Sequence, residues 1–152
     1  MTTLCDRLGI ELPIIQAPMA GVQGSALALA VSNAGGLGSL PCAMLSPEGM
    51  REELRALKDG TERPYNVNFF CHNPPVQDEE CERAWVEVLS PYYREYGLNI
   101  DTIPTGLSRQ PFSAESAELL SEFKPRVVSF HFGLPHPSLV ERVKSWGAIV
   151  LS

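Results

Sequence analysis

The sequence predicts an α/β fold of the TIM-barrel type, in which parallel strands are covered by outer helices. Short apolar runs alternate with amphipathic stretches about five times along the chain, and the runs are apolar along their length. Such strands are typical of parallel sheets that are buried on both faces. No GxGxxG follows the first run and no GxxxxGK[ST] occurs, which disfavours a doubly wound nucleotide-binding sheet without excluding it.

The size of the chain bears on which of these folds it can complete. Its 152 residues are 44% hydrophobic and 20% charged, enough for one globular domain with a core. A TIM barrel typically needs about 250 residues, and Ser152 directly follows a strand-like run. We therefore expect residues 1–152 to be a single domain that forms an incomplete barrel.

Five apolar runs are predicted to be strands: Leu12–Ala17, Gly36–Leu40, Tyr65–Phe70, Arg126–Phe132 and Ala148–Leu151. The first is closed by Pro18, which cannot donate a backbone hydrogen bond. The fourth is the clearest strand, since it is rich in β-branched and aromatic residues and is followed by Gly133.

Five intervening stretches are predicted to be helices: Gly24–Asn33, Ser46–Lys58, Glu79–Tyr96, Ser113–Glu122 and Ser138–Trp146. Ser25 is the expected N-cap of the first helix, and Gly35 is expected to end it. Ser46 and Pro47 are expected at the N-cap and first position of the second. Pro91 is expected to break the third. Gly97–Pro111 is rich in turn residues and receives no assignment.

Charge and composition exclude several classes of protein. The net charge is −6 and no basic run occurs, so nucleic acid and anionic membranes are not expected partners. The apolar runs fall short of the roughly 20 residues that span a bilayer, and Asp6 and Arg7 stand where a signal peptide would be apolar. The four cysteines form no CxxC pair. We expect a cytoplasmic protein with reduced thiols.

Candidate ligand-binding residues follow from the position of each strand end, because reactive groups in parallel sheets gather at the carboxyl ends of strands. The first run leads into Ala17, Pro18 and Met19, where small and rigid residues let the backbone approach a flat ligand. The alternative is a tight turn that only packs.

Asn66 and Asn68 share one face of the third run, although Asn is unfavourable inside a strand. Their amides could bind a ring carbonyl or N–H of a heterocycle, or could be satisfied by the neighbouring backbone. His131 ends the fourth run and could move a proton or bind an anion; the alternative is a histidine buried in the core. No spacing typical of metal ligands and no GxSxG nucleophile motif occurs.

Four stretches resemble, in order and spacing, the nitronate monooxygenase family, which older usage calls the 2-nitropropane dioxygenase family. They are LPIIQAPMAG (12–21), VSNAGGLGSL (31–40), VNFFC (67–71) and VSFHFGLP (128–135). CHNPP (71–75) and LSPYY (89–93) look like the bacterial class I members of this family. The resemblance runs from about Cys5 to the last residue.

This resemblance implies an FMN-dependent TIM barrel that oxidises alkyl nitronates with dioxygen. Residues 1–152 would be its N-terminal part, with about five of eight strand–helix units. Ala17, Pro18 and Met19 would then approach the flavin, Asn68 would contact FMN, and His131 would face the active site and hydrogen-bond the anionic nitronate. The resemblance suggests no comparable role for Asn66.

The sequence also departs from the family. The loop at Gly21–Gly24 has Val and Gln where relatives often carry paired glycines. The segment with the family's catalytic histidine, and the loops that hold the FMN phosphate, would lie beyond Ser152, so we expect weakened FMN binding by this chain.

Two alternatives stay open. One is a catalytically inactive barrel fragment that self-associates through its open sheet edges. The other is a relative of the enoyl reductases or NADH:quinone reductases that share an FMN barrel. Flavin content and turnover separate the first alternative from the enzyme, and NADH oxidation separates the second.

Overall fold

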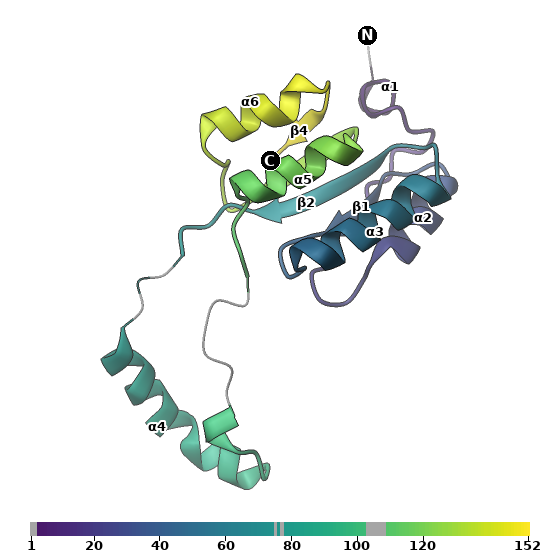
Figure 1. Ribbon diagram of the computed structural model, residues 1–152. Coiled ribbons are helices and arrows are strands. Elements are labelled where there is room, and N and C mark those ends of the chain that lie inside the picture. Colours follow the sequence, from purple (N-terminus) through teal and green to yellow (C-terminus); the bar gives the residue numbers. More distant parts are fainter. Residues whose placement is uncertain (1–2, 75, 77, 103–108) are drawn as a thin grey trace. The chain divides into compact units, whose positions relative to one another are not determined.

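The computed structural model describes residues 3–74, 76, 78–102 and 109–152 (Figure 1). They form two compact units, one running up to Asn73 and resuming at Arg109, the other within Pro74–Ser108. Pro75 of the CHNPP stretch and residues 103–108 of the turn-rich segment lie outside the described residues.

A four-stranded parallel sheet forms the centre of the larger unit. Its strands are β1 (Gly38–Pro41), β2 (Tyr65–Phe70), β3 (Val127–His131) and β4 (Ile149–Leu151). They pair in chain order, β1-β2-β3-β4, and every pair is parallel. The predicted α/β class with a parallel sheet is therefore confirmed.

The first predicted strand, Leu12–Ala17, is wrong in its extent. Only Ile15 pairs, through one parallel bridge to Leu37, with hydrogen bonds that join Leu37 N to Ile14 O and Gln16 N to Leu37 O, each at 2.9 Å. Leu12, Ile14 and Ile15 are exposed. An apolar run becomes a buried strand only where other elements cover it, and here little covers it.

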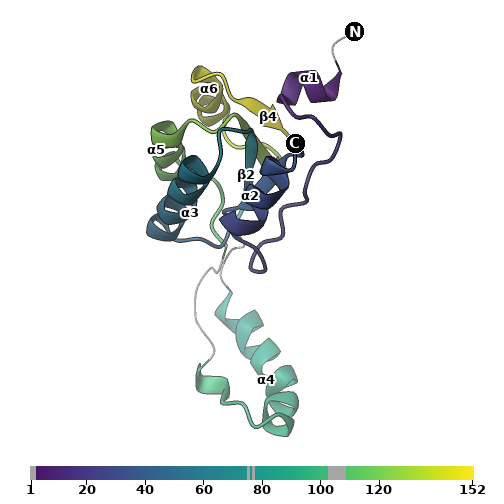
Figure 2. The ribbon, with the colours of Figure 1, turned by 90° about the vertical axis from the view of Figure 1, so that its right-hand side faces the viewer.

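Four helices accompany the sheet: α2 (Ser25–Asn33), α3 (Pro47–Gly60), α5 (Ala114–Phe123) and α6 (Pro137–Ser145). Figure 2 shows α3, α5 and α6 beside one another along one side of the sheet. A short helix that was not predicted, α1 (Leu4–Leu8), begins at a capping box of Thr3 and Asp6.

The predicted helix ends are partly right. Ser46 caps α3 by accepting a hydrogen bond from Gly49 N at 3.1 Å, with Pro47 at the first helical position. Gly35 follows α2 with a φ of +97°. The N-cap of α2 is Gly24 rather than Ser25, so the N-cap offers no side-chain acceptor; the Glu53 carboxylate accepts from the Ser25 N–H in its place.

The apolar face of the sheet, called here the helix face, forms the main core with these helices. Its strand residues are Leu40, Val67, Phe69, Val128 and Phe130. Phe112 packs between two of these rings, with centroids 4.7 Å from Phe69 and 5.1 Å from Phe130. At the start of β1, a Cβ on Gly38 would lie 2.0 Å from Ala28 O, so only glycine lets α2 pack this close.

The smaller unit contains α4 (Glu79–Glu95) and a short 3₁₀ helix (Ile100–Thr102). Asp78 caps α4 by accepting from the N–H groups of Glu80 and Cys81. The helix continues through Pro91, so the predicted break there is wrong.

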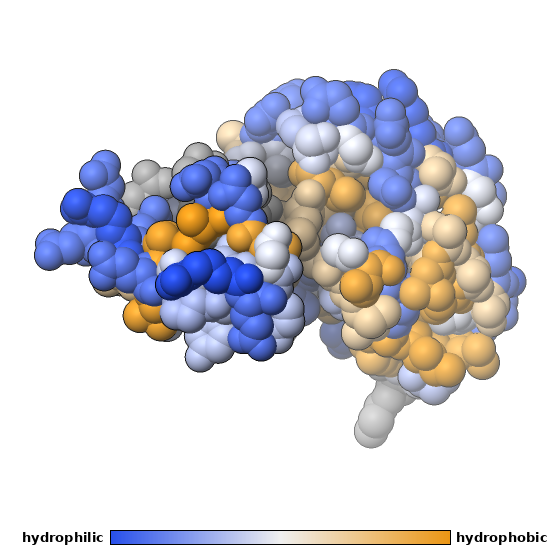
Figure 3. Space-filling view, turned by 90° about the horizontal axis from the view of Figure 1, so that it is seen from below, coloured by the Kyte–Doolittle hydropathy of each residue, from blue (hydrophilic) through white to orange (hydrophobic). Residues whose placement is uncertain are grey.

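Hydrophobic side chains reach the surface in both units, and Figure 3 shows several such places on the side that it displays. In the larger unit they include Ile14 and Val22, and on α4 they include Trp85 and Tyr92. No helix of the described part of the chain is long and apolar enough to cross a membrane.

Candidate functional site

The face of the sheet opposite the helix face carries buried polar side chains, and we call it the polar face. Its members are Ser39, Asn66, Asn68 and Ser129. Strand register brings them together, because Ser39 lies opposite Asn66 and Asn68 lies opposite Ser129. Successive side chains of a strand point to opposite faces, so the same strands supply both faces.

Hydrogen bonds join the polar face into one network. Asn66 Nδ2 donates to Ser39 Oγ at 3.1 Å and to Ser129 Oγ at 2.9 Å. Asn68 Nδ2 donates to Ser129 Oγ at 2.9 Å and to Ser129 O at 3.3 Å. The amide of Asn66 is therefore bound by neighbouring hydroxyls, and that of Asn68 by a hydroxyl and a backbone carbonyl.

Two glutamines of the first loop form hydrogen bonds with the backbone of Ser39, a member of this network. Gln16 Nε2 donates to Ser39 O at 3.3 Å and Gln16 Oε1 accepts from Ser39 N at 3.2 Å, while Gln23 Nε2 donates to Ser39 O at 2.8 Å. Ala17, Pro18 and Met19 lie between these two anchors. Ala17 and Met19 are exposed and Pro18 is half-buried.

These anchors were not predicted from the sequence. Gln16 and Ser39 are polar residues within the apolar runs 12–17 and 36–40, and Gln23 lies in the loop after the first run; those positions were the one signal available. Their shared partner becomes visible only when the chain is folded.

Two buried acceptors of the network have no hydrogen-bond partner among the described residues: Asn66 Oδ1 and Gln23 Oε1. A buried polar atom without a partner costs about 1–3 kcal/mol. Both atoms belong to amides whose nitrogen reaches Ser39. A ligand with N–H donors is the chemistry that this arrangement could satisfy.

Four aromatic rings gather at the carboxyl ends of β2 and β3, and we call them the ring cluster. They are Phe70, His72, His131 and Phe132. Phe70 lies opposite His131, two residues beyond the Asn68–Ser129 pair on each strand, so it continues the polar face. The rings of Phe70 and His131 are stacked, with centroids 6.2 Å apart and an interplanar angle of 20°.

The structure thus puts two predicted residues, Asn68 and His131, on one face of the sheet, with Asn68 buried and His131 exposed. The arrangement places hydrogen-bonded amides beneath a partly exposed aromatic surface with two imidazoles. Such a surface can hold a flat ring or a small anion.

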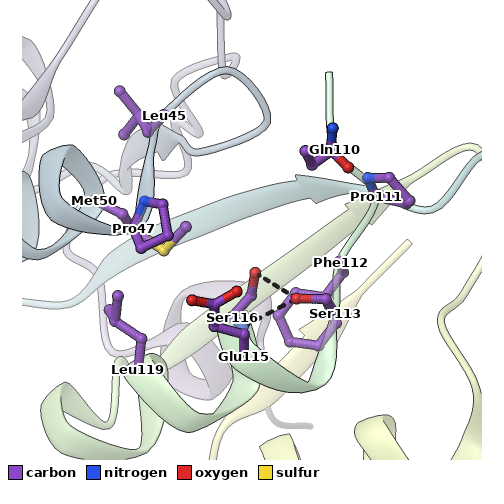
Figure 4. A pocket seen from close by; sticks show the side chains of 10 residues that line it. All are labelled: Leu45, Pro47, Met50, Gln110, Pro111, Phe112, Ser113, Glu115, Ser116 and Leu119. Carbon is purple, nitrogen blue, oxygen red and sulfur yellow. Dashed lines mark hydrogen bonds between the residues drawn. The ribbon is translucent and has the colours of Figure 1, made fainter. Parts of the chain in front are cut away.

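A cavity of about 410 Å³ lies elsewhere, between the beginnings of α3 and α5. Figure 4 shows it lined mainly by apolar side chains such as Leu45, Met50 and Leu119, with Ser113 and Glu115 at its edge. It contains none of the predicted site residues and brings together no group of titratable side chains. The polar face and ring cluster are therefore the better candidate for chemistry.

The thiols near the strand ends are poor nucleophiles. Burial raises the pKa of Cys42 far above its ordinary value, and burial raises the pKa of Cys71 to about 11. Both are therefore protonated at neutral pH. Within the described ranges, no three His, Cys, Asp or Glu side chains are placed to hold a metal ion.

Comparison with known sequences gives the same family along the whole chain. A family model described as nitronate monooxygenase matches residues 1–152. The nitronate monooxygenase of Paraburkholderia phytofirmans is 44% identical over 98% of this chain and 41% of its own length. That of Pseudomonas aeruginosa is 42% identical over 95% of this chain and 41% of its own length. The chain spans about two fifths of these curated relatives.

Solved structures agree on the fold. The nitroalkane oxidase from Streptomyces ansochromogenes matches with a TM-score of 0.77 and 31% identity, over 93% of this chain and 40% of that one. A mutant of FabK from Thermotoga maritima matches with a TM-score of 0.65 and 24% identity, over 99% of this chain and 38% of that one, a likeness of fold alone. The predicted TIM-barrel type is thereby confirmed.

Proposed function

Because the chain belongs to the nitronate monooxygenase family, we propose that its polar face and ring cluster serve the oxidation of alkyl nitronates by dioxygen with FMN as cofactor. Residues 1–152 would form the N-terminal part of the FMN-dependent barrel domain. The observation that carries the proposal is the network of amides beneath exposed rings, found on the stretches that match this family. The four cysteines are free thiols, which supports a cytoplasmic location.

The residues present fit a flavin ring. The pyrimidine edge of the ring offers an N–H donor, and among the described residues the polar face holds two unpartnered acceptors, Asn66 Oδ1 and Gln23 Oε1, either of which that donor could satisfy. When bound, FMN supplies a two-electron acceptor that can pass electrons on to dioxygen.

The loop at Ala17, Pro18 and Met19 is proposed to lie against the flavin, because its anchors Gln16 and Gln23 hold it at the polar face. Asn68 is the second proposed contact. It is only 1% exposed, and both hydrogen bonds donated by its Nδ2 go to Ser129. A direct contact with the flavin therefore needs the residues that cover Asn68 to rearrange.

His131 is proposed to bind the nitronate. Its imidazole lies exposed at the end of β3, where a ring N–H can donate to an anionic oxygen. The ring of Phe70 stacks beside the imidazole. The chain would thus hold the anion in place and offset its charge.

The first test is the visible absorption spectrum of the purified chain, followed by extraction and identification of any flavin. A yellow protein that releases FMN, or a chain that binds added FMN, supports the cofactor assignment. Oxygen consumption with ethyl nitronate then tests the reaction. A chain that stays colourless at millimolar FMN contradicts the assignment for these residues.

One observation also favours self-association through the open sheet edge. Within the described residues, β4 pairs with β3 on one side and with no strand on the other, and an unpaired edge can pair with another chain. Sedimentation velocity across a range of concentrations tests this: a dimer supports it and a monomer throughout contradicts it.

A further inference from the structure

Phe132 has an unusual backbone conformation for its residue type. Its φ is +67°, and Gly133 follows with a φ of +105°. The left-handed region is unfavourable for a side chain with a Cβ, and glycine is the residue that normally occupies it. Strain of this kind persists where something else fixes the conformation, and it is frequent at functional sites.

Burial does not explain this conformation. Phe132 is 69% exposed and belongs to neither hydrophobic core of the larger unit. The ring contacts recorded for it are with the ring cluster: Phe70 at 5.0 Å and 73°, His72 at 6.4 Å and 88°, and His131 at 6.3 Å and 75°. The ring therefore stands across three others at steep angles, with most of its surface open.

This geometry puts an apolar surface next to two imidazoles. His72 and His131 can donate hydrogen bonds to an anion, and Phe132 together with Phe70 can cover a hydrocarbon group attached to it. The fitting ligand is a small planar anion that carries an alkyl chain.

We propose that Phe132 is a specificity-determining residue: its exposed ring covers the alkyl group of a substrate whose anionic end lies at His131. The proposal rests on the proposed function, because it names which part of the nitronate this residue recognises. The left-handed turn at Phe132 and Gly133 is what directs the ring toward the site.

The test uses ligands that need neither flavin nor oxygen. Straight-chain carboxylates from acetate to hexanoate have the planar, two-oxygen anionic end of a nitronate and cannot be oxidised in its manner. NMR titration of the 152-residue chain gives a dissociation constant for each. Complete burial of a methylene strengthens binding about fourfold and half burial about twofold, so we expect affinity to rise about two- to fourfold per methylene.

Three variants separate the role of the ring from that of the turn. Phe132→Ala removes the ring, and we expect the gain per methylene to fall below about 1.3-fold while acetate binds as before. Phe132→Gly should reduce the gain in affinity per methylene equally and should also remove the strain at the positive φ of residue 132. Leu134→Ala is the matched control, since Leu134 is a neighbouring side chain that is 56% exposed and lies outside the ring cluster; its series should stay as steep as that of the unchanged chain.

The proposal is overturned if the unchanged chain shows no dependence on chain length, if Phe132→Ala keeps it, or if Leu134→Ala loses it equally. Loss of acetate binding in Phe132→Ala also overturns it, because the ring would then support His131 rather than the alkyl group. If affinity rises with the length of the carboxylate in a protein that fails to oxidise nitronates with FMN, the proposed function is refuted, whereas the role of Phe132 in covering alkyl groups is retained.

Discussion

Val67 and Asn68 are neighbours on β2, yet their side chains lie on opposite faces of the sheet and in different chemical surroundings. Val67 is buried against helices in the main core, whereas Asn68 donates to Ser129 on the polar face. The pattern repeats on β3, where Phe130 joins the core and His131 ends the strand in the open. One set of strands therefore supplies the main core on one face, and on the other face it carries reactive groups beside a smaller core that includes Val127.

The two faces also differ in how completely their groups are satisfied. On the helix face, the side chains of Val67, Phe69, Val128 and Phe130 pack together and have no polar atoms to satisfy. On the polar face, Asn66 Oδ1 and Gln23 Oε1 are buried without a donor in the part of the chain that the structure describes, and a buried acceptor without a donor costs free energy. A surface that is costly without a ligand is suited to binding one.

The strongest test of this division is Phe130→Ala on the helix face. Phe130 is 1% exposed and packs against Phe112, so its loss leaves a cavity. We expect the free energy of unfolding to fall by about 3–5 kcal/mol, measured by urea unfolding followed by circular dichroism. Phe132→Ala is the control and should change it by less than about 1 kcal/mol; comparable losses in the two variants would refute the division.

On the polar face, the variant His131→Ala tests the reaction separately from the stability of the fold. Because the side chain is exposed, the unfolding curve should stay nearly unchanged. In the FMN-loaded protein, kcat/KM for ethyl nitronate should fall about 100-fold, as when one hydrogen-bond donor to a developing anion is lost. Unchanged kinetics would show that His131 does not touch the substrate.

Asn68→Ala should affect both properties, because Asn68 joins the two strands beneath the proposed flavin. Loss of its hydrogen bonds should lower the free energy of unfolding by about 1–2 kcal/mol and weaken FMN binding about 10-fold, measured by fluorescence titration.

The matched control for Asn68→Ala is Ser32→Ala. Ser32 is equally buried, donates to Pro64 O and accepts from Gly38 N, and lies away from the polar face. The Ser32→Ala variant should lose a similar part of the free energy of unfolding as Asn68→Ala and should keep its FMN affinity. A parallel loss of affinity would mean that Asn68 acts only through the fold.

The smallest expected effect lies outside both faces, on the surface of the helices. Arg51 on α3 forms an ion pair with Glu122 on α5. The hydrogen bonds from Arg51 hold the pKa of Glu122 below its ordinary value of 4.5. A carboxyl whose pKa is lowered in the folded state stabilises the fold above its unfolded pKa, and this contribution is lost as the pH falls through the folded pKa.

Glu122→Gln should therefore unfold at slightly lower urea than the unchanged chain at pH 7, and the difference should vanish once the pH falls below the lowered pKa of Glu122. Exposed pairs contribute little, so the shift should be small. Glu52→Gln is the control, since Glu52 is exposed on α3 and makes no ion pair within the described residues. A difference that persists at low pH would exclude an electrostatic origin.

Local sequence predicted most of the fold. Tyr65–Phe70 is a strand with the predicted bounds, and Ser46 with Pro47 begins a helix as predicted, because periodicity and capping depend on nearby residues. Leu12–Ala17 failed as a strand because pairing depends on what lies beside it. Pro91 failed as a break, since α4 continues through it.

For the candidate site, the sequence by itself determined that Asn66 and Asn68 share one face and that His131 ends a strand, because side chains alternate along a strand with a period of two. The joining of Gln16 and Gln23 at Ser39, the unpartnered acceptors beside them and the contacts of the Phe132 ring with Phe70 and His72 were decided by the tertiary structure alone. These features arise where segments distant in the sequence meet, and a hydrogen bond or a ring contact between them depends on distances that no local pattern specifies.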